Sequence, residues 1–177
     1  MFQLLDIKDI TIRSVKDYKT GDNLNYIVIK ERSKCDAYGS SLSVDLPDTI
    51  SANSDYEIII SYRTTVACSA LQWLDPVQTA GKTHPYMFSQ CQAIHARSLI
   101  PCQDTPSVKI TYEARVYVPK PLTCLMGAVR LGSEPANGNY TLTKFAQKGK
   151  SCNVNLKEFN HNVLKPSFPK TVRSMLL

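Results

Sequence analysis

Residues 84–109, HPYMFSQCQAIHARSLIPCQDTPSVK, gather side chains that could take part in chemistry: two histidines, two cysteines, three glutamines and one aspartate. Histidine and cysteine bind zinc and serve as bases and nucleophiles. Glutamine side chains donate and accept hydrogen bonds but do no useful acid–base chemistry. The segment therefore allows three kinds of site: a metal centre, a cysteine nucleophile, or a surface that holds a substrate.

A metal centre would need three or four converging ligands, and Cys91, His95 and Cys102 are the nearest candidates. Their spacing, C-x3-H-x6-C, matches no common zinc motif, and no second pair of ligands follows at a useful distance. We therefore expect one partly buried histidine and two reduced cysteines here, and no metal site on this chain.

A cysteine nucleophile would need a thiolate beside a histidine. Cys91 and His95 are four residues apart, a spacing that brings two side chains together only on a helix. The surrounding YMFSQCQAI is typical of an extended or irregular segment, and no cysteine-protease signature is present. We expect no catalytic residue on this chain.

The third possibility rests on Gln90 and Gln92, which have the same parity on an extended segment, so both amides could face one cleft. Two amides in line suit the binding of a peptide backbone or a carbonyl group. They could equally satisfy neighbouring strands, because buried amides usually pair with backbone groups. Spacing alone leaves both alternatives open. Farther along, Asp104 is expected to cap the turn before Pro106.

The elements that would position these residues are predicted to be β-strands. Alternating apolar and polar residues over 107–119 and 55–65 indicate two long strands, and Ile59 interrupts the polar face of the second. No amphipathic helix of three turns is predicted, and residues 69–85 resemble a loop. Further strand candidates, bounded by turn residues, lie at 4–12, 24–32, 41–47, 123–130 and 139–147.

Length and composition place the chain among globular proteins of one domain, since it has 177 residues and 43% hydrophobic residues. No apolar run approaches the roughly 20 residues of a membrane helix. The first residues, MFQLLDIKDITIR, lack the features of a signal peptide. Six cysteines without a CxxC pair favour reduced thiols. We therefore expect a cytoplasmic protein without a membrane partner.

The net charge of +6 is confined to the C-terminal part of the chain. Residues 1–143 carry 14 basic and 14 acidic residues, whereas residues 144–177 carry seven and one. The main body has no basic surface that would attract phosphate, so no nucleic-acid partner is expected. Residues 149–177 are predicted to be a basic tail that is poorly ordered.

Two motifs in this segment, QCQAIHAR and PCQDTPSVK, resemble those of the M1 zinc aminopeptidases, in the forms found in the leukotriene A4 hydrolase and aminopeptidase B subfamily. The resemblance covers residues 4–148 and ends there. It implies residues 1–148 to be a partial M1 N-terminal domain, with 149–177 an unmatched tail. The implied fold is all-β, a saddle-like β-sandwich of mixed or antiparallel sheets, incomplete at its N-terminal edge.

The resemblance also implies a role for the glutamines, because in this family the Gln-x-Gln segment lines the active-site cleft and contacts bound peptide. Carried over residue by residue, the implied substrate-binding residues are Gln90, Cys91, Gln92 and Ala93. Asp104, Pro106 and Lys109 match the family motif too and are expected to be structural.

The departures from the family concern catalysis. The H-E-x-x-H motif that binds zinc and the G-x-M-E-N motif that recognises the substrate amine are both absent from these 177 residues. Zinc is thus implied for the intact family but not for this chain. We expect a fragment of a zinc metalloaminopeptidase that helps to bind peptide, is inactive alone, and has the missing catalytic domain as its partner. The alternative is a non-catalytic β-sandwich that acts as a protein-interaction module.

Overall fold

The computed structural model confirms the all-β prediction and divides the chain into two compact units. The first comprises residues 1–68, 97–104 and 166–177, and the second comprises residues 69–96 and 105–165. The structure describes residues 2–30, 38–48, 50, 55–151, 159–160 and 170–175, with the backbone alone for 2–3, 151, 159–160 and 170–175.

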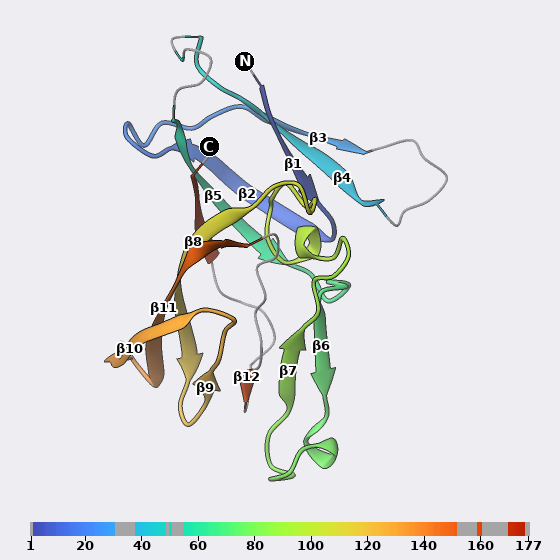
Figure 1. Ribbon diagram of the computed structural model, residues 1–177, viewed down its shortest axis with the longest axis vertical. Helices are drawn as coiled ribbons and strands as arrows, with labels where there is room; N and C mark the ends of the chain where they lie inside the picture. Colours follow the sequence, from blue (N-terminus) through green and yellow to red (C-terminus); the bar gives the residue numbers. More distant parts are fainter. Residues whose placement is uncertain are drawn as a thin grey trace. The chain divides into compact units, whose positions relative to one another are not determined.

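The first unit contains two three-stranded antiparallel sheets (Figure 1). In one sheet, β4 (Ser40–Asp45) lies between β1 (Phe2–Ile7) and β3 (Tyr26–Lys30). In the other, β5 (Glu57–Thr64) lies between β13 (Lys170–Met175) and β2 (Ile10–Asp17).

Both sheets of the first unit contribute to one core, as the alternation in the sequence predicts. The expected inward residues of β5, Ile58, Ile60 and Tyr62, are almost fully buried, and Ile59 on the opposite face is half-buried. Burial of such side chains from facing sheets is the main source of stability in a sandwich. The core residues are Leu5, Ile7, Val15, Leu42, Val44, Leu46, Ile58, Ile60 and Tyr62.

The second unit also contains two sheets. In the three-stranded one, β11 (Tyr140–Ser151) lies between β10 (Val129–Ala136) and β8 (Ile110–Pro119). The strands of the four-stranded one follow the order β6 (Leu71–Leu74), β7 (Tyr86–Ser89), β12 (Phe159–Asn160) and β9 (Thr123–Cys124). Its buried core consists of Met87, Val118, Leu122, Cys124 and Phe145.

Three predicted boundaries differ from the structure. The single strand expected at 4–12 is two strands of different sheets, separated at Asp9, whose φ of 52° breaks the extended backbone. The strand expected at 123–130 includes both β9 and the beginning of β10. The loop expected at 69–85 contains β6, which forms because it pairs with β7 rather than because of its own sequence pattern.

The helical residues of the described part are Tyr38 and two 3-10 turns, η2 (Pro76–Gln78) and η3 (Ala96–Ser98), so the prediction that long helices are lacking is confirmed there. None of the described helices reaches the length and apolarity needed to cross a membrane. The prediction for the tail, 149–177, falls mostly on residues outside the described part and stays a prediction.

Candidate functional site

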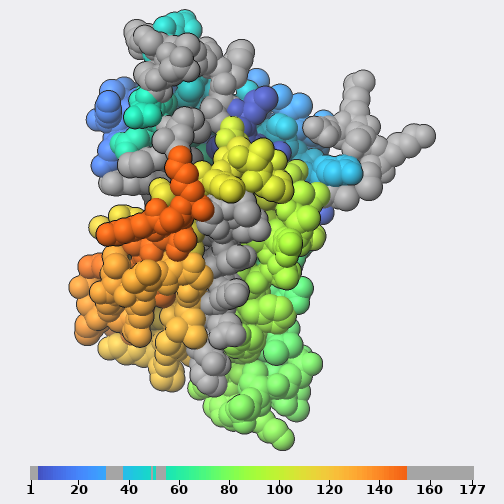
Figure 2. Space-filling view, in the orientation of Figure 1, coloured from blue at the N-terminus to red at the C-terminus, as the bar shows by residue number. Residues whose placement is uncertain are grey.

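The segment that carries the predicted binding residues begins where β7 ends. β6 and β7 form an antiparallel hairpin in which Leu71 is opposite Ser89 (Figure 1). The pairing continues one step past the strand, since the Gln90 N–H donates to the Ala70 carbonyl at 2.9 Å. In the space-filling view this green hairpin forms a continuous surface down to its tip (Figure 2). Gln90 is thus held by the sheet, although it lies outside it.

After Gln90 the backbone turns, so the extended geometry assumed for both glutamines ends at the first of them. The Gln90 side-chain oxygen accepts a hydrogen bond from the Gln92 N–H at 3.1 Å. The His95 N–H donates to the Cys91 carbonyl at 3.0 Å, which closes the turn. The peptide bond between Gln92 and Ala93 is cis. We call residues 90–95 the binding segment.

The binding segment exposes three of its four predicted contact residues. Gln90, Gln92 and Ala93 are exposed, whereas Cys91 is 1% exposed. The described bond uses one lone pair of the Gln90 oxygen, and an amide also has a second lone pair and two N–H donors. The segment can therefore offer donors and acceptors to a peptide backbone, with the Cys91 side chain directed into the protein.

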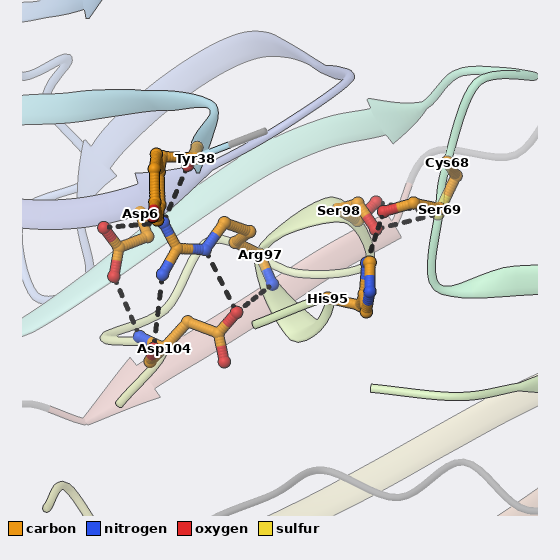
Figure 3. A network of polar contacts seen from close by, with 8 residues as sticks. All are labelled: Asp6, Tyr38, Cys68, Ser69, His95, Arg97, Ser98 and Asp104. Atoms are coloured by element: carbon orange, nitrogen blue, oxygen red, sulfur yellow. Dashed lines mark hydrogen bonds and ion pairs between the residues drawn. The ribbon is translucent and has the colours of Figure 1, made fainter. Parts of the chain in front are cut away.

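The histidine of this segment is held by a serine that the sequence did not single out. The Ser69 hydroxyl lies 2.9 Å from the His95 Nδ1. Figure 3 shows the two side chains pointing toward each other. Ser69 precedes β6 by two residues, so only the pairing of β6 with β7 brings it near His95. No local pattern around Ser69 indicates this contact, and knowing the hairpin register is the one way to find it.

These contacts give no support to a cysteine nucleophile. Reactive cysteines are partly exposed to solvent, and the Cys91 side chain is buried. The His95 ring is engaged by the Ser69 hydroxyl. Within the described ranges, no three His, Cys, Asp or Glu side chains are grouped so that they could hold a metal ion. The described residues therefore do not form the zinc site of the family.

In the PCQDTPSVK motif, Asp104 makes its described contacts within the first unit. Asp104 was expected to cap the turn before Pro106, but its side chain binds Arg97 instead. The Asp104 Oδ2 accepts hydrogen bonds from the Arg97 Nε and from the Arg97 backbone N–H, each at 3.1 Å (Figure 3). The Arg97 Nη1 donates to the Tyr38 carbonyl at 2.7 Å and lies 3.5 Å from Asp6 Oδ1. The Asp104 carboxylate pairs with Arg97 rather than with the N–H groups of the turn, because a buried carboxylate needs a charged partner.

Comparison with known proteins gives one family for most of this chain. The profile of the Peptidase M1 N-terminal domain matches residues 4–152. The chain is 44% identical over 146 residues to leukotriene A-4 hydrolase of Xenopus laevis, and 44% identical over 146 residues to leucine aminopeptidase 2 of Aspergillus fumigatus. These matches cover 81% and 82% of this chain, but the chain spans only 23% of the length of each relative.

Solved structures agree with this assignment of the fold. The complex of yeast LTA4 hydrolase with bestatin aligns over 91% of this chain and 23% of its own, with a TM-score of 0.69 and 31% sequence identity. An M1 zinc metallopeptidase from Deinococcus radiodurans, solved with the peptide Tyr-Ser-Ala, aligns over 84% of this chain and 31% of its own, with a TM-score of 0.62. At 16% identity the second likeness concerns the fold alone.

Proposed function

Because the chain belongs to the M1 peptidase family, whose N-terminal domain its residues 4–152 match, we propose that it supplies part of the peptide-binding surface of a zinc aminopeptidase of the leukotriene A4 hydrolase type. The residues assigned to peptide contact are Gln90, Cys91, Gln92 and Ala93. Catalysis is assigned to a zinc domain that these 177 residues, which lack H-E-x-x-H, do not provide. The proposed compartment is the cytoplasm.

One observation carries the proposal: the exposed amides of Gln90 and Gln92 lie on a segment that is tied to the sheet at Ala70 and closed on itself at Cys91. Side-chain amides on a backbone held in this way can pair with the carbonyl and N–H groups that every peptide has, whatever its side chains. Such a surface orients a substrate and does not break a bond. Cys91 is proposed to contact the peptide through its backbone alone, since its side chain is buried.

Peptide contact is tested with trialanine, a probe that offers backbone groups and little else. The full chain is titrated with trialanine while the side-chain amide resonances of its glutamines are followed by NMR. We expect the resonances of Gln90 and Gln92 to shift, and Gln90→Ala with Gln92→Ala to weaken binding about tenfold, as loss of two hydrogen bonds would. Gln72→Ala, an exposed glutamine of the same hairpin, is the matched control. Shifts confined to Gln72 would contradict the proposal.

The division of labour with a zinc domain is tested separately. The purified chain is expected to contain no stoichiometric zinc and to leave aminoacyl-arylamides intact; hydrolysis by the chain alone would contradict this. In the source cells, an antibody against residues 84–109 is expected to capture a product larger than 19.8 kDa whose peptides include an H-E-x-x-H motif. A product of 19.8 kDa that contains KEFNHNVLKPSFPK would instead favour the interaction module.

That second candidate, a non-catalytic interaction module, is favoured by one feature of the first unit. Leu4 and Ile27 are opposite Ser43 on β4, so all three lie on the same face of the β1–β4–β3 sheet, on which Ser43 itself is buried. Leu4 is 55% exposed and Ile27 is 62% exposed. Exposed apolar faces of this kind are often contact surfaces. Co-purification of the chain with a full-length homologue would support this function, and Ile27→Ser should then abolish it.

A further inference from the structure

Two consecutive residues of the second unit hold the two ends of the binding segment. The Ala70 carbonyl accepts from the Gln90 N–H at 2.9 Å, and the preceding Ser69 hydroxyl lies 2.9 Å from the Nδ1 of His95 (Figure 3). The first contact extends the β6–β7 ladder and is set by the hairpin register. The second depends on two side chains, so it can be removed without changing the backbone.

Between these two ties, the segment is supported by bonds of its own and by the burial of the Cys91 side chain. The His95 N–H donates to the Cys91 carbonyl at 3.0 Å, and the Gln92 N–H donates to the Gln90 side chain at 3.1 Å. Gln92 and Ala93 are exposed, so little packing restrains them. If His95 were released, one end of the segment would lose its tie to the β6–β7 hairpin, and the exposed residues would gain freedom.

We propose that Ser69 and His95 are positioning residues that fix the binding segment before a peptide arrives. This inference rests on the proposed peptide-binding function and adds two residues to it, neither of which contacts the substrate. A segment held in its bound conformation does not have to be ordered on binding, so affinity is higher than for a mobile one. Ser69 and His95 thus raise the affinity for peptide indirectly, by holding the segment that carries Gln90 and Gln92.

The test measures hydrogen exchange of the full chain by mass spectrometry, with and without trialanine. Ser69→Ala removes the hydroxyl, Ser69→Thr keeps it, and Ser133→Ala is the matched control. The control breaks another side-chain bond of the same unit, the one between the Ser133 and Thr143 hydroxyls at 2.8 Å. In Ser69→Ala we expect amide exchange across residues 90–95 to rise about fivefold to tenfold, while exchange across β11 stays unchanged.

Ser69→Thr should restore slow exchange across the binding segment, and Ser133→Ala should not affect it. Trialanine should protect the segment in the wild type and in Ser69→Thr, and about fivefold less well at equal concentration in Ser69→Ala. Unchanged exchange across 90–95 in Ser69→Ala overturns the positioning role. Equal loosening in Ser69→Thr also overturns it, because the hydroxyl would then not be what matters.

The two proposals fail in different ways. If Ser69→Ala loosens the segment but trialanine protects nothing in the wild type, the positioning role stands and the peptide-binding function falls. If trialanine protects the wild type and Ser69→Ala equally, the function stands and the positioning role falls. Should Ser69→Ala fail to fold, nitrogen NMR of the wild-type His95 ring decides: one dominant tautomer supports a fixed hydrogen bond at Nδ1, and a tautomer mixture overturns it.

Discussion

Arg97 binds Asp104 with both its side chain and its backbone: the Nε and the backbone N–H donate to the same carboxylate oxygen, each at 3.1 Å. The Asp104 side chain is 3% exposed and that of Arg97 is 10% exposed, so the pair is desolvated. The Asp104 N–H in turn donates to Asp6 Oδ2 at 2.9 Å. Residues 97–104 are thereby fastened to β1 by charge as well as by packing.

Removing the arginine should therefore destabilise the chain strongly. Arg97→Met would leave a buried carboxylate without its partner, and we expect a loss of about 3–5 kcal/mol of unfolding free energy in urea. Lys144→Met provides the control, because it breaks the exposed Lys144–Glu134 pair at 2.8 Å. That exposed pair should contribute at most about 1 kcal/mol. Comparable losses for the two variants would contradict the importance of burial.

Gly39 is predicted to tolerate no side chain, for two separable reasons. Its φ is +81°, and a Cβ there would meet the Ile7 carbonyl and lie 2.9 Å from Lys8 Cβ. Gly21 has φ +79° but nothing within 4 Å of its Cβ position. We expect Gly21→Ala to cost about 1–2 kcal/mol for the backbone alone, and Gly39→Ala about 1–3 kcal/mol more for the clash. Equal costs in urea unfolding would rule out the clash.

The loss of folding stability at acid pH should depend on Asp17. Its pKa lies below the ordinary value because the Tyr56 hydroxyl and the Thr20 N–H donate to its carboxylate. Because the Asp17 pKa is lower in the folded state than in the unfolded state, the ionised carboxylate stabilises the protein at pH values above its unfolded-state pKa. This contribution to stability is lost as the pH falls below about 4 and through the folded-state pKa. Asp17→Asn should flatten this part of the pH–stability curve, and Tyr56→Phe should flatten it partially. A curve unaltered in both variants would refute the linkage.

The same pair acts in the opposite sense at alkaline pH. Burial and the bond to Asp17 raise the pKa of Tyr56 from 10.0 to about 12. A raised folded-state pKa means that the contribution is complete below about pH 10 and disappears as the pH rises towards about 12. Ultraviolet titration should show Tyr56 ionising late, together with Tyr62 and Tyr112, whose pKa values burial also raises, and Asp17→Asn should bring only the Tyr56 ionisation to lower pH. An unmoved titration in Asp17→Asn would exclude the carboxylate as a cause.

Cysteine labelling should separate the thiols of the described residues by burial. Burial raises the pKa of Cys124 to about 12, so almost no thiolate exists at about pH 8. Cys102 is only half-buried and should react with iodoacetamide first, as peptide mass spectrometry would show. In urea, both should react at similar rates. Native labelling of Cys124 as fast as that of Cys102 would mean that β9 opens readily.

The strands with a clear period were the predictable part of the fold. The alternation over 107–119 correctly places Val118 in a core and Glu113 at the surface, because one face of β8 is covered and the other is not. β6 could not be predicted, since Leu71 and Trp73 become a strand only through pairing with Ser89 and Met87. Non-local pairing leaves no mark on the strand that it stabilises.

The binding segment shows the same limit at the level of single residues. The composition of the motif drew attention to Gln90 and Gln92, and the structure places both at the surface. The spacing of the two glutamines suggested one extended segment. The backbone instead turns after Gln90, where the Gln92 N–H donates to the Gln90 side chain. Ser69 escaped notice because its partner, His95, is 26 positions away. Side-chain bonds of this range follow from the hairpin register, which the sequence alone does not specify.

The discontinuous make-up of the first unit has a consequence for biosynthesis. Its residues 1–68 are translated well before residues 97–104, yet the bond between Asp104 and Asp6 joins positions 98 apart. The nascent first unit must therefore wait, with β1 lacking these partners, while the hairpin that carries the binding segment leaves the ribosome. Contacts of such long range slow folding. In the other sheet β5 waits longer still, because its partner β13 is formed by Lys170–Met175. Translation that stalls before Arg97 would therefore release a first unit whose strands lack these partners and are prone to pair with other chains.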